Sequence, residues 1–199
     1  RVGAVSRDPH REESRMTVRR LDLGSGYNPF LPDDPEWEHA EIAPGAPHVE
    51  HRVSVFGPLP FADGEFAELR AVDVLEHETY RRTDAVLAEW ARILAPGGTL
   101  RVMVPDAETI MVRYASDAMG LQTPEFEGRP PILAAAWRIM GGHADGNYSR
   151  DGDDWRWNAH YAAYSADSLT WHLEHAGLFR VDRMERNGHP NLICRAIRL

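Results

Sequence analysis

Two glycines near the start of the chain have the spacing of a ligand-binding turn. Gly24 and Gly26 flank Ser25, directly after an apolar run that ends at Leu23. A glycine turn after the first strand of a parallel sheet lets a ligand approach the backbone and directs amide N–H groups at an anionic group. Position 29 is Pro29, so the third glycine of a dinucleotide fingerprint is absent. The turn alone predicts a nucleotide-type ligand without saying which one.

An acidic residue stands near the end of the next predicted strand. Glu41 lies in the segment 38–42, which Pro44 and Gly45 close. A carboxylate at this position commonly accepts hydrogen bonds from both hydroxyls of a ribose. We therefore expect Glu41 to bind a ribose, the alternative being a solvated carboxylate at a loop edge.

Three histidines are the candidates for acid–base chemistry. His77 follows a predicted strand, whereas His143 and His160 lie in a later segment rich in glycine, aspartate and tryptophan. Histidine suits proton transfer near neutral pH. We predict a catalytic role for His77, His143 and His160. The alternatives are a structural turn residue for His77 and surface or packing roles for the other two.

The segment 142–160 also combines two imidazoles with several carboxylates. Its spacing matches no compact ligand set, and the EF-hand pattern fails, so we predict no metal site. A polar substrate lid is favoured, and an acidic surface loop with inward-packed tryptophans is the alternative. The predicted walls of the lid are Trp137, Trp155, Trp157 and Tyr161.

Composition excludes several kinds of chemistry. The 199 residues include no lysine, which removes Schiff-base and Walker-type mechanisms. A formal net charge of −9 argues against a general nucleic-acid binder. No apolar run reaches the roughly 18 residues of a membrane span. The single cysteine, Cys194, cannot form an internal disulfide, which fits a cytoplasmic protein.

Alternating strands and helices must position these groups. Strands are predicted at 18–23, 38–42, 49–55, 69–75 and 99–104, the fourth of them apolar enough to be buried on both faces. Helices are predicted at 83–94, 107–114 and 167–176. Two closing strands, 179–185 and 191–197, are too close in sequence for a crossover and should form an antiparallel hairpin.

The predicted fold class is therefore α/β. We expect a Rossmann-like, seven-stranded, mostly parallel sheet with an antiparallel C-terminal hairpin and helices on both faces. Residues 1–16 are charged and aperiodic and are interpreted as a flexible tail or lid. Residues 17–199 would form a single domain, with an insertion at about 116–160 that caps the substrate site.

Five segments together resemble the class I S-adenosylmethionine (SAM)-dependent methyltransferases. They read LDLGSG at 21–26, LPFADGEF at 59–66, VDVLEH at 72–77, ILAPGGTL at 93–100 and LEHAGL at 173–178. Their order and spacing are similar to the small, type-11-like branch of that family. The resemblance covers residues 18–112 and 160–198.

The resemblance implies SAM as the cofactor and assigns roles to its binding residues. Asp22 would anchor the amino-acid end, Glu41 would hold the ribose, and Ile42 would pack on adenine. The full implied set is Asp22, Gly24, Ser25, Gly26, Glu41, Ile42, Asp73, Val74 and Leu75. The acidic residue that this family often has after its third strand is absent here, and Ser54 or a backbone carbonyl would substitute.

The predicted function is methyl transfer to oxygen or nitrogen of a small polar acceptor, such as a metabolite, a sugar or a natural-product intermediate. The donor is already activated, so the protein mainly aligns the acceptor and excludes water. The first alternative is a SAM-binding, non-catalytic regulator or partner subunit. An NAD or nucleotide-sugar enzyme would explain the glycine turn but not the closing hairpin. A small-molecule partner is expected, nucleic acid and membrane are disfavoured, and a homodimer stays open.

Overall fold

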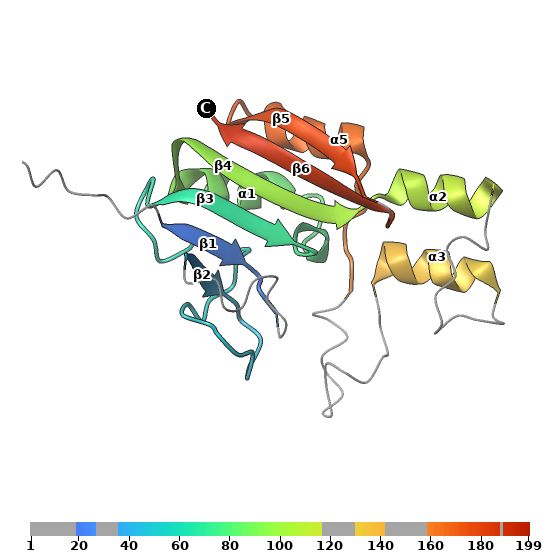
Figure 1. Ribbon diagram of the computed structural model, residues 1–199, viewed down its shortest axis with the longest axis horizontal. Helices are drawn as coiled ribbons and strands as arrows, with labels where there is room; N and C mark the ends of the chain where they lie inside the picture. Colours follow the sequence, from blue (N-terminus) through green and yellow to red (C-terminus); the bar gives the residue numbers. More distant parts are fainter. Residues whose placement is uncertain (1–18, 27–35, 117–129, 142–158, 188) are drawn as a thin grey trace, which may run out of the picture.

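A twisted sheet with strand order β2-β1-β3-β4-β6-β5 forms the centre of the protein (Figure 1). The structure is a computed structural model that describes residues 19–26, 36–116, 130–141, 159–187 and 189–199. The predicted tail 1–16 lies outside the described residues. The strands are β1 (Arg20–Leu23), β2 (Trp37–Ala40), β3 (Phe66–Val72), β4 (Leu94–Pro105), β5 (Phe179–Arg186) and β6 (Asn191–Arg198).

The pairing of the strands brings three loops to one edge of the sheet. Strand β1 pairs in parallel with β2 and β3, and β3 pairs in parallel with β4. Strand β6 is antiparallel to both β4 and β5. The carboxyl ends of β1, β2 and β3 therefore meet at a common edge, where α/β proteins of this type bind their ligands.

The described sheet has six strands, where seven were predicted. The missing strand is 49–55, which keeps only an isolated parallel bridge between Ala40 and His51. The preceding backbone bends at His48, which has a φ of 58°. Arg52 then donates hydrogen bonds to the carbonyl oxygens of Ala43 and Ala46. The segment thus bonds to the loop that precedes it. Among the described residues, the outer edge of the four-residue β2 has a single bridge to it.

One face of the sheet is apolar and packs against helices α1 (Thr83–Ile93) and α5 (Ala166–Glu174). Figure 1 shows both helices behind the sheet. Leu21, Leu69 and Leu100 are fully buried on neighbouring strands of this face. Trp90 of α1 is buried with them, and its indole N–H donates to the carbonyl of Val55 at 2.9 Å. Among the described residues, helices cover only this face, although they were predicted on both.

The opposite face carries charged side chains. Asp22 and Arg70 are register partners on β1 and β3, and both are buried. Two hydrogen bonds of 3.1 and 2.8 Å join the guanidinium of Arg70 to the carboxylate of Asp22. His39 of β2 lies 3.3 Å from the same carboxylate. Residues 69–71 are buried on both faces of the sheet, as predicted for 69–75, but the second face buries the charged pair of Asp22 and Arg70 and is therefore not apolar.

Helices α2 (Ala107–Ser116) and α3 (Pro131–Met140) lie beyond the end of β4 (Figure 1). They pack together through Ile110, Ala134 and Ala135. Asp106 is fully buried before α2 and accepts hydrogen bonds from Thr109 and Arg186, which fixes the start of the helix. In the part of the chain that is described, no helix combines the length and the hydropathy needed to span a bilayer.

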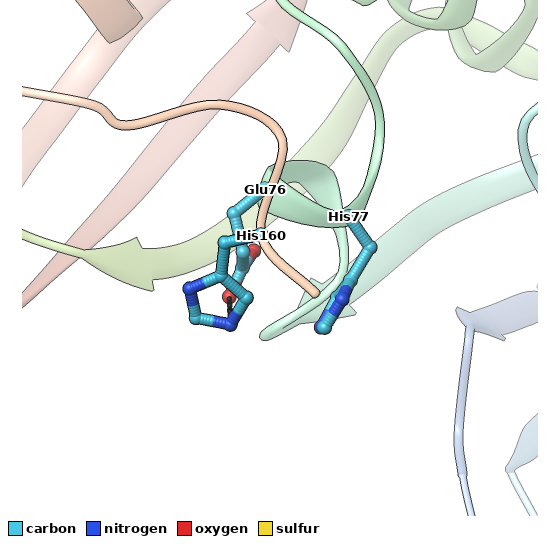
Figure 2. Close-up of side chains that lie close together, drawn as sticks. All are labelled: Glu76, His77 and His160. Carbon is cyan, nitrogen blue, oxygen red and sulfur yellow. Dashed lines mark ion pairs between the residues drawn. The ribbon is translucent and has the colours of Figure 1, made fainter. Parts of the chain in front are cut away.

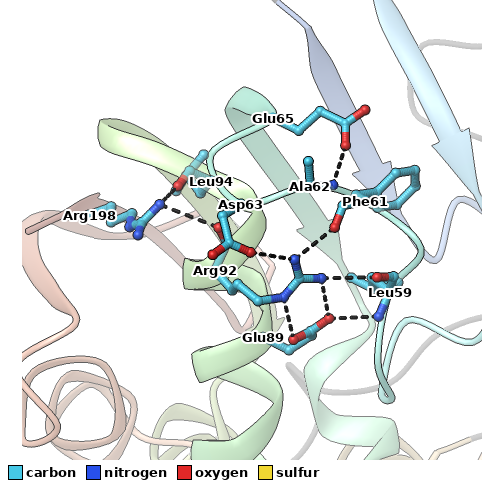
Figure 3. Close-up of polar contacts among 9 residues, drawn as sticks. All are labelled: Leu59, Phe61, Ala62, Asp63, Glu65, Glu89, Arg92, Leu94 and Arg198. Atoms are coloured by element: carbon cyan, nitrogen blue, oxygen red, sulfur yellow. Dashed lines mark hydrogen bonds and ion pairs between the residues drawn. The ribbon is translucent and has the colours of Figure 1, made fainter.

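Arg92 ties the segment before β3 to helix α1 (Figure 3). Its guanidinium donates to the backbone carbonyls of Leu59 and Phe61 at 2.9 and 2.7 Å. It also bonds the carboxylates of Glu89 and Asp63. These carboxylates raise the pKa of Arg92. One planar cation with five donors therefore organises the whole 59–65 turn.

Replacing Arg92 with lysine should lower the free energy of unfolding by about 1–2 kcal/mol, because one ammonium cannot satisfy both carbonyls and both acids. Chemical denaturation checks the value. The matched control is Arg180→Lys. Arg180 is exposed, and within the described residues its guanidinium lies 3.8 Å from the carboxylate of Asp182. A control effect as large as that of Arg92→Lys would contradict the role assigned to this network.

Candidate functional site

The glycine turn after β1 is held tightly at its first glycine. Gly24 has a φ of 70°, and its N–H donates to the carbonyl of Ala40 at 2.8 Å. A Cβ at position 24 would lie 2.7 Å from a methyl group of Val74. Only glycine combines this backbone conformation with this close packing. Val74, which follows β3, therefore sets the floor of the turn.

The second glycine faces open space and contacts Glu41. Gly26 has a φ of 63°, and no atom of the described residues lies within 4 Å of the position of a Cβ there. Its N–H donates to Glu41 at 2.8 Å, and the other oxygen of this carboxylate accepts from the N–H groups of Ile42 and Ala43. The structure thus brings Glu41 to the glycine turn, although fifteen positions separate it from Gly26.

The other predicted cofactor residues around the turn differ in their exposure and in their contacts. Asp22 has both oxygens bonded to Arg70 within the sheet, so its carboxylate supports the turn from behind. Ser25 is buried beside it. Ile42 is 39% exposed and offers an apolar surface next to Glu41. Ser54 accepts a weak 3.4 Å hydrogen bond from the N–H of Phe56 and so closes a local turn.

Residues 73–75 lie at the same edge of the sheet. Asp73 has a φ of 53°, a conformation that non-glycine residues seldom adopt, and its N–H donates to Met103. Burial raises the pKa of the Asp73 carboxyl, yet its side chain keeps contact with solvent. Val74 and Leu75 are buried, and Leu75 begins the short helix η1 (Leu75–His77).

Two of the three predicted catalytic histidines meet at this edge (Figure 2). The rings of His77 and His160 lie 4.8 Å apart, edge to face. The N–H groups of Tyr161 and Ala162 both donate to the carbonyl of Glu76, at 2.7 and 3.1 Å, and so fasten the strand-like segment of His160 to η1. His143 and the tryptophans at 155 and 157 lie outside the described residues. Tyr161 is 47% exposed.

The surroundings of His77 disfavour its charged form. Burial lowers the pKa of His77, and the carbonyls of Ala159 and Asp73 and the charge of Glu41 oppose that shift. Nδ1 lies 3.1 Å from the carbonyl oxygen of Ala159. Because a carbonyl only accepts, Nδ1 carries the hydrogen and Nε2 keeps its lone pair.

Glu76 is a site residue to which no role was assigned from the sequence. It is 1% exposed, and neither carboxylate oxygen has a hydrogen-bond partner among the described residues. Burial raises the pKa of Glu76 well above its usual value, and the charge of Asp73 raises it further. The signal was present in the sequence, because Glu76 stands between the apolar pair Val74 and Leu75 and a candidate catalytic histidine.

No protein-family model and no curated protein matches the sequence, but solved structures match the fold. A SAM-dependent methyltransferase from Aquifex aeolicus is 17% identical, with 92% of this chain and 83% of that chain covered and a TM-score of 0.55. A Burkholderia thailandensis 1,6-didemethyltoxoflavin-N1-methyltransferase, solved with 1,6-didemethyltoxoflavin and S-adenosylhomocysteine, is 16% identical, with coverage of 91% and 71% and a TM-score of 0.53.

A third structure is a complex between the Haloferax volcanii Trm112 methyltransferase activator and a methyltransferase. The matched chain is 14% identical, with 92% of this chain and 82% of that chain covered and a TM-score of 0.59. At these identities the similarity concerns the fold. This protein therefore has the fold of the class I SAM-dependent methyltransferases, as predicted from its five segments.

Proposed function

We propose that this protein is a SAM-dependent methyltransferase that acts on oxygen or nitrogen of a small polar acceptor. The observation that carries the proposal is the meeting of two groups at one edge of the sheet. The glycine turn with Glu41 forms one side, and the pair His77 and His160 forms the other. A cofactor site beside paired imidazoles is what group transfer to a protonated acceptor requires.

The residues at the glycine turn fit SAM. Gly26 leaves space above its backbone, and Glu41 already accepts a hydrogen bond at that point. Glu41 would exchange this bond for the ribose hydroxyls, Ile42 would pack on adenine, and Asp73 would lie near the methionine portion. Asp22 is proposed to act through Arg70 and the backbone of the turn, not by direct contact. When bound, SAM supplies a methyl group on a positively charged sulfur.

The acceptor side is formed by His77, His160 and the insertion at about 116–160. Helix α3 carries part of that insertion, and His160 returns from it beside Glu76. We propose that the insertion, with Tyr161 at its end, binds the acceptor and excludes water from the edge of the sheet. The histidines would hold the acceptor and receive its proton.

Two measurements test the function. Calorimetry should detect SAM binding to the purified chain, and incubation with a panel of hydroxyl and amine compounds should yield S-adenosylhomocysteine. A chain that binds SAM but transfers methyl to no compound would support the non-catalytic alternative. A chain that does not bind SAM would contradict both.

Replacing Glu41 with alanine should weaken SAM binding by roughly 10–100-fold, because two hydrogen bonds from ribose to a carboxylate are worth about 1.5–3 kcal/mol in total. Calorimetric titration gives the ratio. Glu50→Ala is the control. Glu50 is exposed and, among the described residues, accepts a hydrogen bond from the backbone N–H of His39. Equal SAM affinities in Glu41→Ala and the parent chain would contradict the proposal that Glu41 binds the ribose of SAM.

A further inference from the structure

Three potential ligand groups converge beside the proposed cofactor site (Figure 2). One ligand atom from each of Glu76, His77 and His160 lies within 4.8 Å of the other two. Nε2 of His160 is 3.9 Å from Oε1 of Glu76. The cluster joins helix η1 to the segment at 159–162, and backbone hydrogen bonds hold these two elements together.

Glu76 supplies an unusual feature of this cluster. Its side chain is almost fully buried, and among the described residues neither oxygen receives a hydrogen bond. Burial of a carboxyl group without a partner costs free energy, and natural proteins normally avoid it unless the group binds something.

His77 has the arrangement of a metal-binding histidine. Its Nδ1–H donates to the backbone carbonyl of Ala159 at 3.1 Å. Histidines that bind metals almost always donate their second ring N–H in this way, because the bond sets the tautomer and the direction of the ring. Nε2, on the other side of the ring, then carries the lone pair that an ion would use.

We propose that Glu76, His77 and His160 bind one divalent transition-metal ion, of the Zn²⁺ or Mn²⁺ type. Two imidazoles and one carboxylate suit such ions, whereas Mg²⁺ and Ca²⁺ prefer oxygen ligands. Ligand atoms around one tetrahedral ion lie about 3.4 Å apart. Because the three ligand atoms here lie within 4.8 Å of one another, the side chains need to close by up to about 1.4 Å. The spacing within 142–160 gave no indication of this site, because Glu76 and His77 lie outside that segment.

The site also narrows the class of acceptor, a step that rests on the proposed methyl transfer. Three protein ligands leave at least one coordination position open. With both imidazole lone pairs on the ion, the ion replaces the histidines in the proton-removing role proposed for them above. A hydroxyl acceptor at the open position loses its proton to solvent, its oxygen forms the bond to the methyl carbon, and the C–S electron pair stays on sulfur. The inference therefore favours oxygen over nitrogen as the attacked atom.

The first experiment measures metal binding without any turnover. Chelator-treated protein is titrated with Zn²⁺, and Co²⁺ serves as the probe for visible absorption. We expect one site, with affinity lowered at least about 100-fold in Glu76→Gln and in His160→Ala. Glu76→Gln keeps the shape of the buried side chain, so thermal unfolding should show that the variant is folded.

A second cluster on the surface provides the matched control. Asp84 contacts His172 at 2.7 Å and His175 at 3.3 Å. This cluster is more exposed and lies on the helices α1 and α5, away from the glycine turn (Figure 1). His175→Gln should leave the tight site intact. Loss of binding in His175→Gln alone, or unchanged binding in Glu76→Gln and His160→Ala, would overturn the proposal.

Two further measurements separate this inference from the proposed function. Acetohydroxamate, an oxygen-donor probe, should shift the Co²⁺ absorption bands if a coordination position is open, and unchanged bands would overturn the oxygen-acceptor step. SAM binding is measured separately on metal-free protein. SAM binding without a metal site would defeat only this inference, whereas a metal site without SAM binding would defeat the proposed function.

Discussion

Gly26→Leu is expected to abolish detectable SAM binding while the protein stays folded. Within the described part of the chain, no atom lies within 4 Å of a Cβ at position 26, so a side chain there would occupy the space proposed for the cofactor. A loss of more than about 100-fold, or about 2.7 kcal/mol, is the expected size in calorimetry. Gly24 is the less informative position, because a side chain there would first displace Val74.

The backbone strain of this substitution needs its own control. Gly26 has a φ of 63°, and leucine in this left-handed conformation costs about 1–2 kcal/mol of stability. Gly177 has a φ of 68° at the end of α5, also with no atom near its Cβ position. Gly177→Leu should therefore lose similar stability and keep its SAM affinity. Unchanged SAM binding in a folded Gly26→Leu variant would refute the assignment of the site.

Asp22→Asn should destabilise the fold strongly. Asp22 is 3% and Arg70 is 6% exposed, so the substitution leaves a buried guanidinium without its counter-charge. Loss of one partner of a buried ion pair costs about 3–5 kcal/mol. At about 2–4 °C per kcal/mol for a chain of this size, the melting temperature should fall by roughly 6–20 °C. Differential scanning calorimetry measures this shift.

An exposed pair of similar length provides the comparison. Asp182 and Arg195 also lie 2.7 Å apart, but their side chains are 33% and 48% exposed. Asp182→Asn should cost less than about 1 kcal/mol. The double variant Asp22→Leu with Arg70→Met should recover much of the loss, since apolar residues often replace a buried pair without penalty. Equal effects at the buried and the exposed pair would contradict the account.

Periodicity predicted the strongest elements of the fold. Helix α1 was expected at 83–94 and spans Thr83–Ile93, because its apolar residues recur at helical spacing. The parallel strands and the closing hairpin were also close to their predicted positions. The strand predicted at 49–55 is not formed, because alternation of apolar and polar residues does not by itself provide a neighbouring strand to pair with. Its neighbour β2 has four residues, and the chain turns at His48.

The site was predictable only where it depends on local sequence. Gly24 and Gly26 and the carboxylate of Glu41 lie in motifs whose neighbours determine their positions. The contact of His160 with Glu76 depends on hydrogen bonds from Tyr161 and Ala162, far along the chain. The buried position of Arg70 was missed for another reason. The mean hydropathy of the strand is apolar and does not show that its alternate residues, which share one face, are charged. Alternation of Glu68 and Arg70 with Leu69 and Ala71 would have revealed the charged face.

The hydrogen bond from the N–H of His160 to the carbonyl of Met140, at 3.0 Å, has a consequence for divergence. The two ends of the intervening chain are adjacent, and the Glu76 carbonyl anchors the returning end through Tyr161 and Ala162. For a segment with adjacent ends, doubling its length costs only about 0.6 kcal/mol in closure entropy. On the proposed function, insertions, deletions or grafted loops between Met140 and His160 would therefore alter which compounds are accepted and leave the residues of the cofactor site in place.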